Sequence, residues 1–214
     1  WKLYPYGITS EQYFSNAREV LEKTNKPLVI HGEHPDHMYD EPLKELADHT
    51  KNRHNSESEC LSSMPSSPYL HVAHLSTENG LNNMPSLASS EVCPHHLLLN
   101  LDNCQSMDCK VDPPLRTRND NSTLYNAFRE GQIPILASDH APHTVNEKRS
   151  DTPPSGLPGV ETMIPLMLNE VSEGRLEISR LINAMSEAPA SRLSLERGRI
   201  SEGLTADFMI VDMK

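Results

Sequence analysis

Histidine and acidic side chains in this sequence follow short apolar runs, at the places where buried strands are expected to end. His31, His74 and Asp139 each come directly after such a run or within two residues of it. Imidazole nitrogens and carboxylate oxygens are ligands that suit Zn²⁺, and the chain has no thiolate cluster pointing to another kind of metal site. The sequence therefore predicts a zinc site built from side chains at strand ends.

The remaining histidines carry weaker signals. His95 and His96 follow Pro94, and they either take part in chemistry directly or position a loop. Four more lie in polar sequence and are expected to be exposed to solvent: His34, His37, His49 and His54.

Short apolar runs alternate with helical segments along the chain. Thr9 and Gln12 have the spacing of a capping box, ahead of a helix that ends before Pro27. Further helices are expected over 124–130, capped by Asn121 or Ser122, and over 160–173 and 176–185. This alternation, with polar residues at strand ends, is typical of an α/β barrel, and a doubly wound open sheet is the second interpretation.

The apolar runs account for about five of the eight strands of a complete barrel. We therefore expect a partial (β/α)8 TIM-type barrel over residues 1–192 and the start of a small β-sandwich domain over 193–214. Within that second part, residues 206–212 have the composition of a strand. The segment Asp48–Pro68 has few apolar residues and is expected to be either a long mobile loop or a poorly ordered helix-loop, without a functional role.

Charge and composition exclude several kinds of partner. The chain has 19 Lys and Arg against 30 Asp and Glu, a net charge of -11, which argues against binding to nucleic acid or anionic membranes. No apolar run approaches the roughly 20 residues of a membrane-spanning helix, so a cytoplasmic location is expected. Four cysteines without a Cys-x-x-Cys motif are expected to be reduced thiols: Cys60, Cys93, Cys104 and Cys109.

Four motifs, in this order, resemble the dihydroorotases of the cyclic amidohydrolase superfamily. They are SEVCPHHL at 90–97, KVDPPLRT at 110–117, ASDHAPHT at 137–144 and GLPGVET at 156–162. The resemblance covers nearly the whole chain and is weakest over 48–68. It implies reversible hydrolysis of the cyclic amide of dihydroorotate to N-carbamoyl-aspartate, a reaction of pyrimidine biosynthesis.

The same resemblance implies a binuclear zinc centre at the mouth of the barrel. His31 and His74 match the two histidines that hold one zinc, and Lys2 matches a lysine that is carboxylated by carbon dioxide and bridges both ions. Asp139 matches a metal ligand that is also the general base and acid. The implied reaction is attack of a metal-bridging hydroxide on the ring carbonyl, after which Asp139 delivers the proton to the leaving nitrogen.

Further residues match substrate or metal contacts of the family. His143 matches a residue that binds the substrate carboxylate, and Ser155 with Gly156 matches a backbone contact nearby. Glu91 matches a residue that holds an additional zinc in some members.

The sequence also departs from the family pattern. Asp112 stands where many members have Asn, and its charge disfavours an anionic substrate unless Arg116 compensates. The His-x-His of the first family strand and the Arg that follows it are absent, and the chain begins at Trp1 without an initiator Met. A further part of the protein is therefore expected upstream.

Two other functions stay open at this point. One is hydantoinase or allantoinase activity, which uses the same chemistry, although the runs at 113–117 and 139–144 favour dihydroorotase. The other is a truncated, non-catalytic domain that binds a partner through its unpaired sheet edges. The expected partners are a small-molecule substrate and either further copies of the chain in a homo-oligomer or a transcarbamoylase.

Overall fold

Five short parallel strands form one sheet in the order in which they occur along the chain. The computed structural model describes residues 1–38 and 45–213. The strands are β1 (Lys2–Leu3), β2 (Leu28–His31), β3 (Leu70–Ala73), β4 (Ser89–Val92) and β5 (Ile135–Leu136). Sequential parallel strands joined by helices form part of a (β/α) barrel, as predicted, whereas a doubly wound sheet would reverse its strand order.

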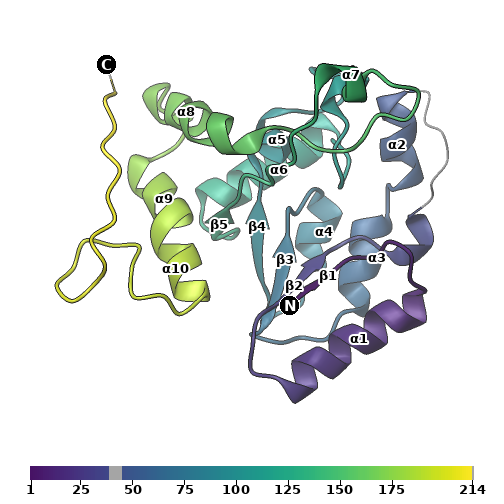
Figure 1. Cartoon of the computed structure of the whole chain (residues 1–214), viewed down its shortest axis with the longest axis horizontal. Helices are drawn as coiled ribbons and strands as arrows, with labels where there is room; N and C mark the ends of the chain where they lie inside the picture. The colour runs from purple at the N-terminus through teal and green to yellow at the C-terminus, as the bar shows by residue number, and fades with distance from the viewer. Residues whose placement is uncertain (39–44, 214) are drawn as a thin grey trace.

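Helices connect successive strands and pack against the sheet (Figure 1). The first six are α1 (Ser10–Lys23), α2 (Leu46–Asn52), α3 (Ser56–Ser63), α4 (Glu78–Asn82), α5 (Pro94–Leu98) and α6 (Arg118–Arg129). They are followed by α7 (Val145–Lys148), α8 (Gly159–Ser172), α9 (Ile178–Ile182) and α10 (Ala188–Arg192). Two 3₁₀ turns, η1 (Pro35–His37) and η2 (Met107–Cys109), and a π-helical turn, η3 (Asn183–Glu187), complete the set. None of the described helices is both long and apolar enough to cross a bilayer.

The main core lies between the sheet and the helices that cover it. It contains strand residues Leu28, Ile30, Leu70 and Val72, with Tyr13 and Ala17 from α1, Cys60 and Leu61 from α3, and Leu124 and Phe128 from α6. Each large apolar side chain buried in this way contributes about 1.5–3 kcal/mol. The strands are therefore fixed along their length, and their ends can present polar side chains.

The N-caps of two helices can be compared with those predicted from the sequence. Thr9 and Gln12 form the predicted capping box of α1. Helix α6 begins earlier than expected, because Thr117 and Asp120 form a second capping box one turn before Asn121. The predicted cap at Asn121 or Ser122 is therefore wrong.

The segment Asp48–Pro68 is largely helical, so the long loop is wrong and the helix-loop is the better of the two expectations. It contains the end of α2 and all of α3, and Cys60 is fully buried in the core. The carboxylate of Glu57 is buried too, and it accepts hydrogen bonds from the backbone nitrogens of Ser76 and Thr77 at 2.9 and 2.8 Å. Several polar residues of this segment, His49, Arg53 and Glu57 among them, are buried and paired inside the protein, which composition alone does not reveal.

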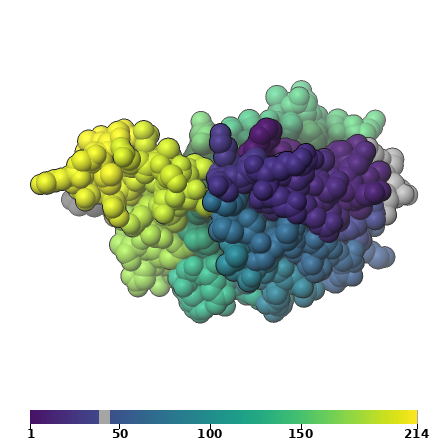
Figure 2. Space-filling model, turned by 90° about the horizontal axis from the view of Figure 1, so that it is seen from below, coloured from purple at the N-terminus to yellow at the C-terminus, as the bar shows by residue number. Residues whose placement is uncertain are grey.

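The residues after α10 project at one end of the molecule (Figure 2). Within the described part of this tail, no strand forms, so the strand predicted over 206–212 is wrong for this structure. Ile200 and Ile210 are 89% and 97% exposed. A strand needs a neighbour for its backbone hydrogen bonds, and the described residues supply none here. The domain boundary at 192 stays a prediction.

The cysteines divide into two kinds. Cys60 and Cys93 are buried free thiols, as expected. Cys104 and Cys109 form a disulfide across η2, so the expectation of four reduced thiols is wrong for this pair. The two residues lie close together because the chain turns tightly between them, with a Cα–Cα distance of 6.3 Å.

Candidate active site

A cavity of about 200 Å³ opens at the carboxyl ends of the strands. Lys2 comes from β1, His31 ends β2, His74 follows β3, and Asp139 follows β5. The sheet therefore brings four of the predicted metal-site residues to one place. The remaining lining residues are Tyr4, Tyr6, Asp112, Ala141, Ser155 and Gly156.

His31 is held in a defined orientation. Its carbonyl accepts a hydrogen bond from the Tyr13 hydroxyl at 2.6 Å, and its Nε2 lies 2.8 Å from Glu33 Oε2. Burial opposes the charge on Glu33, but the hydrogen bond with His31 and the nearby Arg53 outweigh it and lower its pKa. Because an ionised carboxylate only accepts, His31 Nε2 carries the proton and Nδ1 keeps a lone pair for a metal.

His74 is the strongest indication of a missing ligand. It is buried, and its Nδ1 has no hydrogen-bond partner among the described residues. Burial, and next the neighbouring His31, lower its pKa well below the ordinary value, so the ring is neutral. The His31 and His74 ring centroids are 4.5 Å apart. A buried, unpaired imidazole nitrogen is costly unless something binds to it.

Asp139 completes the group at the mouth of the cavity. Burial raises its pKa, while Lys2 and His31 act in the opposite direction. Its backbone φ is 45°, and that of His74 is 38°, in the left-handed region that residues other than glycine rarely adopt. Such strain gathers at functional sites, where the surrounding structure holds it.

The side chains fit a divalent transition metal. Two imidazoles and a carboxylate converge with Lys2 on the cavity, and this donor set suits Zn²⁺. Ligand atoms of Cys93, His95 and Asp139 also lie within 4.8 Å of one another. His95 Nε2 is likewise buried and has no partner among the described residues. Asp139 therefore lies near a second group of possible donors besides those that line the cavity.

Asp112 lines the cavity as an ion-paired carboxylate. Its Oδ1 lies 2.7 Å from His49 Nε2 and 2.9 Å from Arg53 Nη1. Burial alone would raise the pKa of Asp112, but these two partners hold it well below its usual range. His49 was expected to be solvated and is instead 3% exposed, so that prediction is wrong. The charge of Asp112 is thus neutralised by His49 and Arg53, which belong to the segment Asp48–Pro68 that was expected to lack a functional role.

Arg116 has a different partner from the one expected. Its Nη2 lies 3.3 Å from Glu33 Oε1, and its Nη1 donates to the carbonyl of Arg53 at 2.9 Å. Compensation of the Asp112 charge is therefore supplied by His49 and Arg53. Sequence reasoning missed both Glu33 and Arg53 as parts of the site; the position of Glu33, two residues after a strand-end histidine, was the available signal.

The loop that carries Ser155 and Gly156 is fixed by Lys148. The ammonium of Lys148 donates to the carbonyls of Lys110, Pro154 and Gly156 at 2.8, 3.0 and 3.1 Å. Gly156 has a φ of 139°, and a Cβ at this position would lie 2.4 Å from the carbonyl oxygen of Ala141. Lys148 is a positioning residue that no pattern in the sequence indicates.

Three other predicted residues lie outside the described cavity lining. His143 is exposed, and its Nε2 lies 3.1 Å from the Ser155 carbonyl at the rim. Glu91 lies 3.0 Å from His71 Nε2. His96 Nε2 donates to the Pro113 carbonyl at 3.0 Å, which fits the loop-positioning role rather than a direct one.

Comparison with known proteins identifies the family. No protein-family model matches the chain. It is 38% identical over 157 residues to a dihydroorotase of Bacillus cereus (strain G9842), in an alignment that covers 68% of this chain and 37% of the relative. The chain belongs to the dihydroorotase family. A dihydroorotase of Bacillus cytotoxicus gives the same identity and the same coverage. The chain thus spans 37% of the length of the dihydroorotases that it matches.

Solved structures of cyclic amidohydrolases share the fold. A D-hydantoinase (dihydropyrimidinase) from Thermus sp. superposes with a TM-score of 0.81 at 20% identity, over 97% of this chain and 53% of that one. An L-hydantoinase from Arthrobacter aurescens gives 0.80 at 23% identity, over 96% and 54%. A dihydroorotase from Campylobacter jejuni gives 0.66 at 18% identity, over 91% and 58%. The partial barrel of this chain is therefore a substantial part of a known architecture.

Proposed function

We propose that the protein containing this chain opens and closes the ring of dihydroorotate, interconverting it with N-carbamoyl-aspartate. The observation that carries this proposal is the convergence of Lys2, His31, His74 and Asp139 on one cavity, with a buried imidazole nitrogen of His74 left unpaired. The 38% identity to dihydroorotases supports the choice of substrate.

The proposed cofactor is a pair of zinc ions held by these side chains. His31 and His74 would bind one ion through their free ring nitrogens, and Asp139 would contribute a carboxylate oxygen. Lys2 would bridge the two ions as a carbamate, formed when its neutral amine adds to carbon dioxide and loses a proton. When bound, zinc would polarise the ring carbonyl and lower the pKa of water.

Asp139 is proposed to move the proton. Its carboxylate lies in the cavity and is half-buried, and burial raises its pKa toward the range in which a carboxylate can carry a proton briefly. In the hydrolytic direction, the oxygen of water bonds to the ring carbonyl carbon and Asp139 takes a proton from it. The C–N bond then breaks, and Asp139 returns the proton to the departing nitrogen.

The substrate is proposed to lie against Asp112 and the loop at Ser155 and Gly156. An anionic substrate can approach Asp112 because His49 and Arg53 already neutralise that carboxylate. Ser155 and Gly156 line the same cavity, and His143 lies at its rim. We propose Ser155, Gly156 and His143 as the contacts that orient the substrate, whereas the carboxylate of Asp112 lies beside it and still opposes part of its negative charge.

Hydantoin and allantoin are the competing substrates. The hydantoinase structures superpose with high TM-scores, and a five-membered cyclic diamide needs the same chemistry. Identity above 30% is found with the dihydroorotases, which favours dihydroorotate.

A substrate panel on the full-length protein tests the proposal. The protein is assayed with dihydroorotate, hydantoin and allantoin, after metal removal and after zinc is restored. Asp139→Asn is compared with Asp151→Asn, because Asp151 is an exposed carboxylate outside the cavity lining.

We expect dihydroorotate to be opened fastest, activity to return with zinc, and Asp139→Asn to lose at least about 100-fold in kcat while Asp151→Asn stays unchanged. Faster opening of hydantoin would overturn the choice of substrate. A protein that binds zinc but opens none of the three rings would overturn the proposed reaction class.

A further inference from the structure

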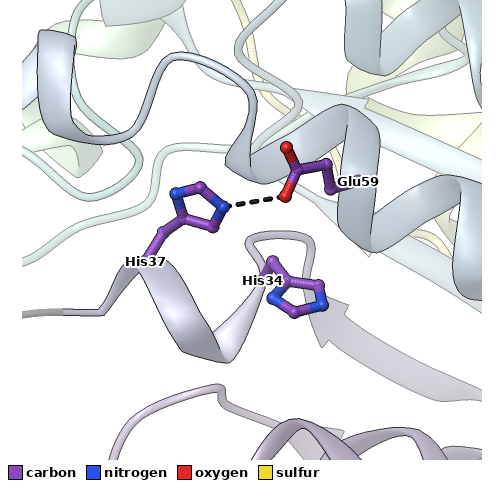
Figure 3. Close-up of side chains that lie close together, drawn as sticks. All are labelled: His34, His37 and Glu59. Atoms are coloured by element: carbon purple, nitrogen blue, oxygen red, sulfur yellow. Dashed lines mark hydrogen bonds and ion pairs between the residues drawn. The ribbon is translucent and has the colours of Figure 1, made fainter.

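Two histidines and a glutamate that do not line the cavity come together between η1 and α3 (Figure 3). His34 precedes η1 and His37 ends it, while Glu59 comes from the middle of α3. Each residue offers a ligand atom, and these atoms lie within 4.8 Å of one another. His37 Nε2 and Glu59 Oε2 are already in contact at 2.8 Å.

The backbone holds the three side chains together. The backbone nitrogen of His34 donates to the Ser56 hydroxyl at 2.9 Å and to the Ser56 carbonyl at 3.1 Å, which fixes the start of η1 against the start of α3. The His34 ring also packs on Phe14 of α1, with centroids 5.4 Å apart. A ligand arriving here would therefore meet a largely preformed group of donors.

We propose that His34, His37 and Glu59 form a second divalent-metal site, separate from the catalytic cavity, and that it takes Zn²⁺. Two imidazoles and a carboxylate are donors that zinc binds, with water filling the fourth position. A cation would replace the proton shared by His37 and Glu59, and the two side chains would then move apart to admit it.

Exposure and charge support this assignment. The side chains of His34, His37 and Glu59 are 16%, 25% and 48% exposed, so an ion can reach them and one ligand position faces water. Asp36 adds a further negative charge, with its Oδ2 3.8 Å from His34 Nδ1. None of these residues lines the active-site cavity. The site would join η1 to α3.

Zinc counting tests the proposal. The metal-free protein is titrated with Zn²⁺ alone against a chromophoric chelator, and sites per chain are counted for wild type, His37→Asn and Glu59→Gln. His54→Asn is the matched control, because His54 is an exposed histidine on the neighbouring turn. Both target side chains lie near the surface, so the two variants are expected to fold, and circular dichroism checks this.

We expect His37→Asn and Glu59→Gln each to bind one zinc fewer than wild type, and His54→Asn to bind the same number. Zinc should also protect His34 and His37, but not His54, from acylation by diethyl pyrocarbonate, read by peptide mass spectrometry. Equal zinc counts in all four proteins, or loss of zinc without protection of His34 and His37, would overturn the proposal.

Discussion

Arg53 Nη1 lies 2.9 Å from Asp112 Oδ1, although 59 residues separate the two in the chain. The same nitrogen donates to Glu33 Oε2 at 3.0 Å. One guanidinium therefore connects a carboxylate in the cavity to a buried carboxylate behind His31. This connection makes the short α2–α3 segment part of the site.

Replacing this guanidinium should be costly. Arg53→Met leaves Glu33 without one of its partners in a fully buried position, and breaking a buried ion pair costs about 3–5 kcal/mol. The free energy of unfolding, measured with urea, should fall by about this amount. Arg118→Met is the control, because Arg118 pairs with Asp102 at the surface and should change stability by less than about 1 kcal/mol. Equal losses in the two variants would contradict the role given to Arg53.

The charge of Asp112 should limit the binding of an anionic substrate. Asp112→Asn removes a negative charge from the cavity lining, while Arg53 keeps its ion pair with Glu33. In the full-length protein we expect KM for dihydroorotate to fall about threefold to tenfold, with kcat nearly unchanged. Asp108→Asn, at the exposed pair with Arg149, should leave KM as it was. A rise in KM with Asp112→Asn would mean that this carboxylate contacts the substrate favourably.

Buried histidines should make the protein sensitive to mild acid. Burial lowers the pKa of His95 to about 4 and holds that of His96 well below 6.5. Both rings are therefore neutral when folded, and the unfolded chain takes up protons first as the pH falls. Stability should be full above about pH 6.5 and decline from there toward pH 4, by about 1.4 kcal/mol per pH unit for each histidine.

Substitution of one ring checks this origin. His96→Gln keeps a donor for the Pro113 carbonyl but cannot titrate, so its urea midpoint should fall less between pH 7 and pH 5 than that of wild type. His54→Gln, at an exposed site, should keep the wild-type pH dependence. An unchanged pH dependence in His96→Gln would show that other groups cause the acid sensitivity.

Gly156 should tolerate no side chain. A Cβ there would lie 2.4 Å from the Ala141 carbonyl oxygen, so Gly156→Ala should displace the loop, raise KM and lower the free energy of unfolding by more than about 2 kcal/mol. Gly131 also has a positive φ, but no atom lies within 4 Å of its Cβ position. Gly131→Ala should therefore cost only about 1 kcal/mol and leave KM unchanged. Matching effects on KM would refute the steric explanation.

Local pattern was enough to find the strand ends and part of the cavity. His31, His74 and Asp139 follow apolar runs, and parallel strands bring such positions to one end of the sheet. The partners of Asp112 were not predictable in this way, because His49 and Arg53 come from a segment whose polar composition resembles a solvated loop. Pairing between distant polar side chains leaves no periodic signal in a sequence.

Two further errors have the same origin. The sequence placed Arg116 near Asp112 because only four residues separate them, yet its guanidinium turns toward Glu33. The strand expected over 206–212 depends on a neighbouring strand, which a local pattern of apolar residues cannot supply. In both cases the structure depends on residues that are distant in the sequence but would have to be close in space.

The sequential order of the five strands also bears on how the protein folds. The cavity is lined by Lys2 of the first strand and by Asp139, which follows the last strand. A long stretch of chain must therefore be closed into a loop before the cavity can form. Early intermediates should therefore lack the cavity even when individual βα units have formed. A ligand that binds only the closed cavity will raise the stability of the whole sheet, including strands it never touches, by an amount that grows with the logarithm of its concentration over Kd.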